Sequence, residues 1–516
     1  MYAVEHAIEH PGKPAIIMAG TGEIVTYGEY ERRCNQVTHL LRAAGLERGD
    51  HIAILSENHP RLLEIEGAAE RIGLYYTLVN AHLGPDEVAY IVDNCRARTV
   101  FTSVAKLEIA RRALACCPRV ERAFVLGLGE TDGAFEPYES AIADLPGDPV
   151  PDQSLGLPML YSSGTTGRPK GILRPLPGTG PQHLLPIQGY VKDLFTYRPG
   201  QVYLNPAPMY HSAPQFSVGV TLRLGGTVVI MEEFDAEQWL ALIERYRVTH
   251  TQVVPTMFHR LLRLPGDVRA RYDLSSLECV VHAAAPCPVP VKRAVIEWFG
   301  PIVVEYYGAT ESNGITFCTA AEWLAHPGTV GRAVVGELLI LDERGERCPP
   351  GADGTVWFRG ATNFEYFEDR VQTAESRSLD GAASTVGDVG HVDEDGYLYL
   401  TDRTTHMIIS GGVNVYPQET ENLLSTHPAV ADVAVIGVPN EDLGEEVRAV
   451  VQPVDPAAAG PHLAGQLIGF CRDNLASVKC PRSIDFVDEL PRLPTGKLQK
   501  RLLRDVYWSG HRTRIL

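Results

Sequence analysis

The 516-residue sequence has no apolar run that approaches the ~20 residues needed for a membrane-spanning helix. Its first residues, MYAVEHAIEHPGKP, have neither a basic start nor an apolar core, so they do not predict a signal peptide. Cations are also scarce: 46 Lys and Arg against 64 Asp and Glu give a net charge of -18. This balance argues against a nucleic-acid partner and against a broadly anionic membrane face.

Cysteine patterns typical of zinc sites or disulfide frameworks are missing as well. The ten cysteines are scattered, the one adjacent pair is Cys116–Cys117, and no CxxC or His/Cys zinc spacing occurs. We therefore expect free thiols in a reducing compartment and predict a cytoplasmic protein without a transmembrane segment.

Length and hydrophobic patterning predict an α/β protein of two or more domains. Tyr30 to Gly45 has helical spacing and ends at a glycine suited to a C-cap. Short apolar runs bounded by Gly or Pro predict buried strands with helices on both faces. These runs are 51–55, 202–204, 227–231, 279–283 and 302–306. Such doubly wound sheets bind ligands at the carboxyl ends of their strands.

The pattern changes from about Gly336 onwards. Residues 337–341 and 355–359 flank a turn-rich segment and predict an antiparallel hairpin. A domain boundary is expected near Asp402–Arg403. Beyond it, strands are predicted at 433–436 and 447–451 and a helix at 463–475, enough for a small separate domain.

Residues 161–171, YSSGTTGRPKG, predict a phosphate-binding loop. Three glycines and four hydroxyl side chains follow an apolar run, so backbone N–H groups and hydroxyls can converge on phosphate oxygens. Arg168 and Lys170 supply positive charge. The lysine is displaced from its Walker A position and no Ser or Thr follows it, which argues against a P-loop NTPase. A flexible surface turn is the alternative, and the motif favours ATP.

This loop resembles the phosphate loop of the adenylate-forming superfamily, which contains acyl-CoA synthetases, firefly luciferase and peptide-synthetase adenylation domains. The resemblance implies that residues of the loop bind ATP. These residues are Ser162, Ser163, Gly164, Thr165, Thr166 and Lys170.

Residues 306–311, YYGATE, place a hydroxyl and a carboxylate after a predicted strand, a pair suited to magnesium and phosphate. A helix N-cap at Thr310 is the alternative. The element is similar to the superfamily's YGxTE motif. That similarity implies that Tyr307 lies along adenine, Thr310 touches the α-phosphate, and Glu311 binds Mg²⁺. It also implies that Gly308 contacts the nucleotide and Ala309 the acyl substrate.

Two further segments resemble nucleotide-binding elements. His282 to Pro286 is similar to the adenine-side turn and implies contacts from Ala284 and Ala285, although a plain strand-ending turn is an alternative. Gly387–Asp388 and the later Arg403 are similar to the ribose-binding elements, with Val386 where the superfamily has threonine. A carboxylate and a guanidinium can both bind ribose hydroxyls. A solvated hairpin with a surface ion pair is the alternative.

Three segments resemble parts that bind CoA or act in catalysis. In MIISGGVNVYP, Gly411 and Gly412 are implied to line the pantetheine tunnel, with a β-bulge as the alternative. The hinge position falls on Thr405, where the superfamily has Asp or Lys. Lys497 in PTGK matches the mobile catalytic lysine, and a solvated surface cation is the alternative.

The segment 208–212, PMYHS, resembles an aromatic element beside the acyl pocket and implies that His211 lies on the substrate side. A core histidine is the alternative. Tyr210, Phe216 and residues 281–285 are expected to complete the wall of this pocket, which would suit a bulky apolar acid.

Together, the motifs from residue 161 to 497 identify the chain as resembling AMP-forming acid:CoA ligases. We expect an adenylation domain over 1–402 with doubly wound sheets and a β-barrel-like subdomain. A small mobile α+β domain over 403–516 would turn about a hinge near 402–406. ATP, Mg²⁺ and CoA are the implied cofactors, and a fatty or other hydrophobic acid the substrate. Oligomeric state stays open.

Alternatives are an aryl or steroid-side-chain acid, a luciferase-like oxygenase, a stand-alone adenylation enzyme and a catalytically silent nucleotide-binding protein. The sequence contains no Ser-centred carrier domain, which favours a free-standing ligase.

Overall fold

The computed structural model describes residues 1–162, 169–360, 364–403, 406–410, 413–440, 443–492 and 498–509, apart from the side chains of Asp402, Arg403 and Asn414. The chain packs into two compact units. Unit 1 comprises Met1–Val253, Arg263–Val281 and Asn363–Thr373, and unit 2 comprises Val254–Leu262, His282–Thr362 and Ala374–Leu516. This division follows packing; the predicted boundary near residue 402 concerns domain motion and stays a prediction.

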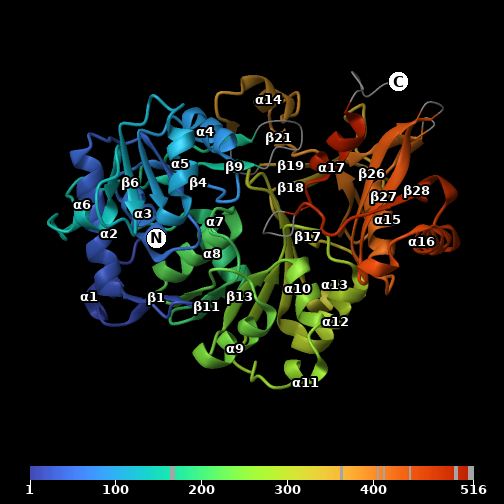
Figure 1. The fold of residues 1–516 in the computed structure, drawn as a ribbon, viewed down its shortest axis with the longest axis horizontal. Helices are drawn as coiled ribbons and strands as arrows, with labels where there is room; N and C mark the ends of the chain where they lie inside the picture. The colour runs from blue at the N-terminus through green and yellow to red at the C-terminus, as the bar shows by residue number, and fades with distance from the viewer. Residues whose placement is uncertain are drawn as a thin grey trace. The chain divides into compact units, whose positions relative to one another are not determined.

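Unit 1 contains a six-stranded, entirely parallel sheet with strand order β7-β6-β5-β3-β4-β8. Its strands β4 and β6 are labelled in Figure 1. The predicted strand 51–55 is confirmed as β3, and all five of its residues are buried, as expected for a strand covered on both faces. The strands are β3 His51–Leu55, β4 Tyr75–Val79, β5 Thr99–Ser103, β6 Arg122–Leu126, β7 Phe135–Pro137 and β8 Leu157–Pro158.

Helices cover both faces of this sheet. On one face, Ala53 and Leu55 of β3 share a hydrophobic cluster with residues of α4 (Pro85–Asn94) and α5 (Leu107–Leu114). On the other lie α2 (Tyr27–Ala43), α3 (Pro60–Arg71) and α6 (Tyr138–Ile142). The helix predicted from Tyr30 begins three residues earlier at Tyr27, because Thr26 and Glu29 form a capping box. Gly45 follows its end with a φ of +73°.

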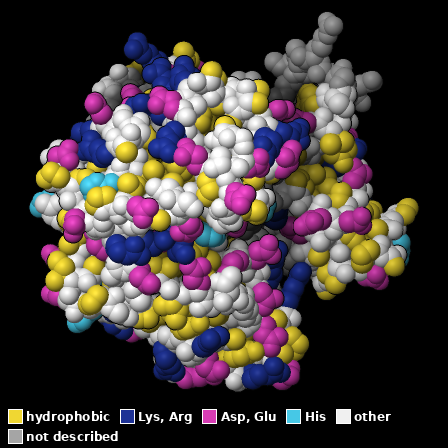
Figure 2. Space-filling model, turned by 60° about the vertical axis from the view of Figure 1, so that its left-hand side comes forward, with side chains coloured by type: hydrophobic (Ala, Val, Ile, Leu, Met, Phe, Trp, Pro, Cys, Tyr) yellow, Lys and Arg dark blue, Asp and Glu magenta, His cyan; other side chains and the backbone are white. Residues whose placement is uncertain are grey.

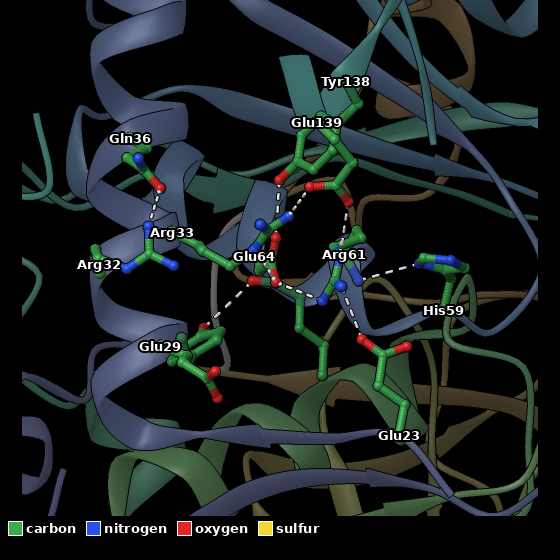
Figure 3. A network of polar contacts seen from close by, with 12 residues as sticks. Glu23, Glu29, Arg32, Arg33, Gln36, His59, Arg61, Glu64, Tyr138 and Glu139 are labelled. Carbon is green, nitrogen blue, oxygen red and sulfur yellow. Dashed lines mark hydrogen bonds and ion pairs between the residues drawn. The ribbon is translucent and has the colours of Figure 1, made fainter. Parts of the chain in front are cut away.

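A network of charged side chains joins α2, α3 and α6 (Figure 3). The fully buried Glu64 lies 2.8 Å from Arg33 Nε and 3.0 Å from Arg61 Nη1, and its second oxygen accepts a 2.9 Å hydrogen bond from the Tyr138 hydroxyl. Both arginines also bind Glu139. Removing one partner of a buried pair costs about 3–5 kcal/mol, so this network fixes how the three helices pack.

A second group of strands in unit 1 has the order β14-β13-β11-β12-β1-β2. Three of its neighbouring pairs are parallel: β1 with β12, β12 with β11, and β11 with β13. Three predicted strands are confirmed here as β11, β12 and β14. The strands are β1 Pro14–Met18, β2 Ile24–Thr26, β11 Val202–Asn205, β12 Thr227–Ile230, β13 His250–Val253 and β14 Cys279–His282. The accompanying helices of the unit are α1 Val4–Glu9, α7 Pro186–Leu194, α8 Ser212–Arg223, α9 Ala236–Tyr246 and α11 Gly266–Arg269.

A small antiparallel sheet in unit 1 has the order β20-β10-β9. Its strands are β9 Leu160–Ser162, β10 Lys170–Leu173 and β20 Glu365–Tyr366, and β20 is followed by α14 (Arg370–Glu375). The predicted phosphate loop therefore starts and ends on paired strands.

Unit 2 begins its β-structure with β15, β16 and β17, which are antiparallel neighbours. The predicted hairpin is confirmed: β18 and β19 are antiparallel, with Glu337 opposite Arg359 and Leu341 opposite Thr355. They belong to a five-stranded antiparallel sheet of order β18-β19-β22-β23, in which β21 pairs with β19. The strands are β15 Val303–Gly308, β16 Ile315–Thr319, β17 Arg332–Val335, β18 Glu337–Leu341, β19 Gly354–Arg359, β21 Ala383–Ser384, β22 Asp388–Val392 and β23 Leu398–Arg403. The helices in this part are α10 Pro255–Leu262, α12 Val289–Phe299 and α13 Ala320–Ala325.

The C-terminal part is α+β, as predicted, with a sheet of order β25-β24-β27-β26 to which β28 adds in parallel. Alternation along β26 separates two apolar faces: Val433 and Val435 cluster with residues of α15 and α16, whereas Ala434 and Ile436 pack with α17. The predicted helix 463–475 is confirmed as α16. The elements are β24 Ile408–Ser410, β25 Val413–Val415, α15 Pro417–Leu424, β26 Val430–Asn440, β27 Gly444–Pro453, α16 Pro461–Asn474, β28 Ser483–Phe486 and α17 Lys500–Trp508.

The surface carries mixed charge on the face shown in Figure 2, where Lys and Arg lie among Asp and Glu without forming one continuous basic field. Among the described residues, no helix has the length and apolarity to cross a membrane. All ten cysteines lie in the described part of the chain and are free thiols.

Buried histidines predict a loss of stability in acid. His250 of β13 is fully buried, and its Nε2 lies 3.2 Å from the carbonyl of Thr196. Burial lowers the pKa of His250 from 6.5 to about 4. The unfolded chain therefore binds a proton at this residue that the folded chain excludes. Stability is present above pH 6.5 and is lost as the pH falls towards 4.

We expect His250→Gln to reduce the loss of unfolding free energy between pH 6.5 and 4 by up to about 3 kcal/mol. Urea unfolding of both proteins at a series of pH values measures this difference. An identical pH dependence in the two proteins would show that His250 has the same pKa in the folded and the unfolded chain, and would contradict the lowered pKa.

Candidate active site

The two ends of the predicted phosphate loop lie on neighbouring strands of unit 1. Ser162, the last residue of β9, is the Cα partner of Lys170, the first residue of β10. Gly171 lies opposite Tyr161, and a Cβ at Gly171 would meet the Tyr161 ring 3.1 Å away, so glycine allows this close pairing. Five predicted residues of the segment, namely Ser163, Gly164, Thr165, Thr166 and Arg168, lie outside the described residues.

The YYGATE element of unit 2 ends β15 and turns into β16. The Ala309 carbonyl accepts a 2.9 Å bond from the Ser312 backbone N–H, which closes a turn at residues 309–312. Strand β16 follows at Ile315, so the alternative role of Thr310 as a helix N-cap is wrong. Thr310 and Ala309 are half-buried, Gly308 is exposed, and Glu311 is buried.

Tyr307 and Asp388, predicted separately for adenine and ribose, are brought together by the fold. The Tyr307 hydroxyl donates a 2.6 Å hydrogen bond to Asp388 Oδ2. Asp388 begins β22, where it lies opposite Arg403 of the antiparallel β23. The two predicted ribose residues are therefore cross-strand partners, and the tyrosine contacts the carboxylate of that pair.

Thr385 is a residue of this site that sequence analysis missed. Its hydroxyl donates a 2.7 Å bond to the Val356 carbonyl and accepts a 3.0 Å bond from the Gly387 backbone N–H. Gly387 has a φ of +82°, which suits glycine. Thr385 thus fixes the turn before Asp388, and Val386 at the expected threonine position leaves the turn intact.

Ala284, at the predicted adenine-side turn, has a φ of +75°, the left-handed region that glycine occupies more readily. The turn follows His282, which ends β14 and is fully buried. Behind it lies a buried ion pair between Lys292 of α12 and Glu305 of β15. Burial raises the pKa of Glu305, and the positive charge of Lys292 offsets part of this effect. No spacing in the sequence indicated this pair.

The predicted acyl-side residues lie at the start of α8 in unit 1. His211 is the residue before the helix, and its ring lies 4.5 Å from that of Tyr210 between centroids. Within the described part of the chain, the buried hydroxyl of Tyr210 has no hydrogen-bond partner.

Asn58 anchors the segment that leads to His211, a role that sequence analysis missed because Asn58 lies in a turn-like stretch. Its Nδ2 donates to the carbonyls of Ala207 at 3.1 Å and Met231 at 2.8 Å. Its Oδ1 accepts a 2.9 Å bond from the backbone N–H of Met209. These bonds tie the segment to β12 and to the N-terminus of α3.

The donors for a cation in this site are few. Among the described residues, no group of three or more His, Cys, Asp or Glu side chains could hold a metal ion. Glu311 offers one buried carboxylate, which fits a magnesium ion that takes most of its oxygens from phosphates and water.

The remaining predicted residues are not tested by side-chain geometry. Thr405, Gly411, Gly412 and Lys497 lie outside the described residues, and Arg403 is described in its backbone only.

Known protein families and relatives match almost the whole chain. The AMP-binding enzyme family matches residues 4–367, and the AMP-binding enzyme C-terminal domain matches residues 419–497. The chain is 32% identical to a fatty acid–acyl-carrier-protein ligase, ScoC, of Streptomyces coeruleorubidus, over 99% of this chain and 96% of the relative. It is also 32% identical to a feruloyl-CoA synthase of an Amycolatopsis species, over 98% of each chain.

Among solved structures, ATP-bound MatB from Rhodopseudomonas palustris superposes with a TM-score of 0.82 at 29% identity, covering 98% of this chain and 99% of that one. The chain therefore belongs to the AMP-binding enzyme family and, within the adenylate-forming superfamily, to the AMP-forming acid:CoA ligases. The predicted α/β fold, with a large N-terminal and a small C-terminal domain, is confirmed.

Asn58 provides a test of how the acyl side is positioned. We expect Asn58→Ala to lower the unfolding free energy by about 2–4 kcal/mol, because three backbone groups lose their partner. We also expect a severalfold rise in KM for the acid with little change in KM for ATP. Asn80→Ala is the matched control, since the Asn80 side chain accepts a local hydrogen bond from the backbone N–H of His82 within one turn. Equal effects of the two substitutions would contradict the anchoring role.

Proposed function

We propose that the chain is an ATP-dependent acyl-CoA synthetase, which activates a hydrophobic carboxylic acid as acyl-AMP and transfers it to CoA. The observation that carries the proposal is the hydrogen bond between Tyr307 and Asp388, with Asp388 opposite Arg403. A tyrosine ring can contact the adenine base, and a carboxylate can accept hydrogen bonds from the two ribose hydroxyls, to which Arg403 would add a donor.

The first half-reaction turns a poor leaving group into a good one. One carboxylate oxygen attacks the α-phosphorus of ATP, the bond to the β-phosphate oxygen breaks, and pyrophosphate leaves with the electron pair. Thr165, Thr166 and Lys170 would hold the β- and γ-phosphates, and Thr310 the α-phosphate. Lys497 would offset the negative charge that develops between carboxylate and phosphate.

Glu311 is the residue that would hold Mg²⁺, which when bound neutralises phosphate charge. The second half-reaction then breaks the acyl–oxygen bond: the CoA thiolate attacks the acyl carbonyl, and AMP leaves. Gly411 and Gly412 would admit the narrow pantetheine arm.

Two different segments serve the two half-reactions, so the C-terminal domain would turn about Thr405 between them. The two family matches support this division, because they end at residue 367 and begin again at residue 419, on either side of 402–406. The C-terminal sheet also has its own apolar clusters on both faces, as a separately moving domain needs.

The acid is proposed to be hydrophobic, either aliphatic or aromatic. The neighbouring rings of Tyr210 and His211 support this substrate class. Of the relatives named above, one is a fatty-acid ligase and the other a feruloyl-CoA synthase, so chain length and ring content are not fixed by similarity. Transfer to an acyl-carrier protein is a second candidate for the thiol acceptor, supported by the likeness to ScoC.

A panel of acids tests the proposal directly. Acids of graded length and ring content are incubated with ATP, Mg²⁺ and either CoA or a phosphopantetheinylated carrier protein. Pyrophosphate, AMP and thioester are then measured. We expect equimolar AMP and pyrophosphate with at least one hydrophobic acid, and thioester with CoA. If no acid releases pyrophosphate, the chain would be a catalytically silent nucleotide-binding protein. Oxygen uptake or light emission would instead indicate a luciferase-like enzyme.

Lys497→Ala is expected to separate the two half-reactions. Because its charge is required only while the carboxylate attacks, adenylation should fall by 100-fold or more, on the order of the effect of removing one charge-stabilising donor. Thioester formation from supplied acyl-AMP and CoA should change by less than about threefold. Equal losses in the two assays would argue against domain alternation.

A further inference from the structure

Lys170, proposed to bind the outer phosphates of ATP, already has partners within unit 1. Its Nζ donates a hydrogen bond to Oε1 of Gln372, and it lies 5.2 Å from the centre of the Tyr366 ring. An amide oxygen and the face of an aromatic ring both attract a cation without neutralising it. The ammonium therefore has a fixed position while its full charge stays available.

The segment that supplies these partners is built onto the strand that carries Lys170. Strand β20 pairs with β10, where Tyr366 lies opposite Ile172. The Phe367 backbone N–H extends this pairing with a 2.8 Å bond to the Gly171 carbonyl. Tyr366 thus lies beside the lysine because of the sheet register.

Helix α14 is tied to the same strand. The Tyr366 backbone N–H donates a 2.9 Å bond to the Thr373 hydroxyl, which itself donates a 2.8 Å bond to the Asp369 carbonyl. Asp369 Oδ1 accepts a 2.9 Å bond from the Gln372 backbone N–H. These bonds fix Gln372 at the start of α14, from where its side chain reaches Lys170.

The neighbouring carboxylates are directed elsewhere. Glu368 forms an ion pair with Arg96, and Asp369 is used as the cap of α14. A carboxylate on Lys170 would form a charge-assisted bond that phosphate must displace, whereas an amide oxygen competes weakly with a polyphosphate. The segment thus places a neutral acceptor on the lysine even though acidic side chains are adjacent in sequence.

We propose that Gln372 and Tyr366 are positioning residues for ATP: they hold Lys170 in place for the β- and γ-phosphates and release it when these bind. This inference rests on the proposed function, because it takes Lys170 as a phosphate ligand. It adds that the 365–373 segment sets the affinity for the triphosphate part of the nucleotide and leaves the affinity for AMP unaffected.

The test compares ATP and AMP binding by calorimetry in three full-length variants. Gln372→Glu puts a carboxylate at the acceptor position, so we expect the Kd for ATP to rise at least tenfold while the Kd for AMP changes less than twofold. Gln372→Met keeps the side-chain length but removes the hydrogen bond to Lys170, so the Kd for ATP should rise by a smaller factor, about threefold to fivefold, with the Kd for AMP unchanged. Val371→Glu adds the same charge at a neighbouring, 70% exposed position and should change neither affinity more than twofold.

Three results would overturn the inference: an unchanged Kd for ATP in Gln372→Glu, a parallel loss of ATP and AMP binding, or an equal effect of Val371→Glu. A double variant, Lys170→Met with Gln372→Glu, should bind ATP no more weakly than Lys170→Met alone, and a further loss would also contradict the contact. If the unmodified protein binds neither nucleotide, the proposed function and this inference both fail. If it forms acyl-AMP and Gln372→Glu binds ATP normally, the inference alone fails.

Discussion

The hydrogen bond from Tyr307 to Asp388 is the interaction on which the proposed nucleotide site depends. It joins the end of β15 to the start of β22, two strands of different sheets in unit 2. The Thr385 hydroxyl fixes the turn before Asp388, and the register of β22 and β23 brings Arg403 opposite. Three residues spread over almost a hundred positions in sequence are thus brought together, and we propose that they bind adenosine.

Buried charge is the second constraint on this fold. Glu64 is fully buried between two arginines, and Lys292 pairs with Glu305 of β15, the strand that also carries Tyr307. Charges used to hold the structure are thus paired with full charges of opposite sign. Lys170, which we assign to phosphate binding, instead contacts a neutral amide and a ring. This difference distinguishes a charge that stabilises the fold from one that is available to a ligand.

Hydrophobic runs and the turn residues between them were sufficient to predict the buried strands, because a run such as 51–55 is apolar from Ile52 to Leu55 and is followed by a turn-like stretch. The hairpin of β18 and β19 was predicted for the same reason. Boundaries were less accurate where side chains decide them: the Thr26–Glu29 capping box starts α2 earlier than hydrophobic spacing indicated.

Motifs predicted which residues belong to the nucleotide site, but the supporting contacts depend on tertiary structure. Asn58 and Thr385 lie in turn-like stretches and Gln372 in the short helix α14, and nothing local to these polar residues indicates their partners. Asn58 contacts Met231 across 173 positions, and Gln372 contacts Lys170 across 202. Contacts at such separations follow from sheet order and register, which single-sequence patterns do not specify.

The central claim is that a carboxylate oxygen of the acid bonds to the α-phosphorus of ATP. It is tested most directly with an acid whose carboxylate is labelled with ¹⁸O and which the enzyme accepts, by mass spectrometry of the products of one turnover with ATP and CoA. The account predicts a single labelled oxygen in AMP and none in pyrophosphate. Label in pyrophosphate, or AMP without label, would contradict it.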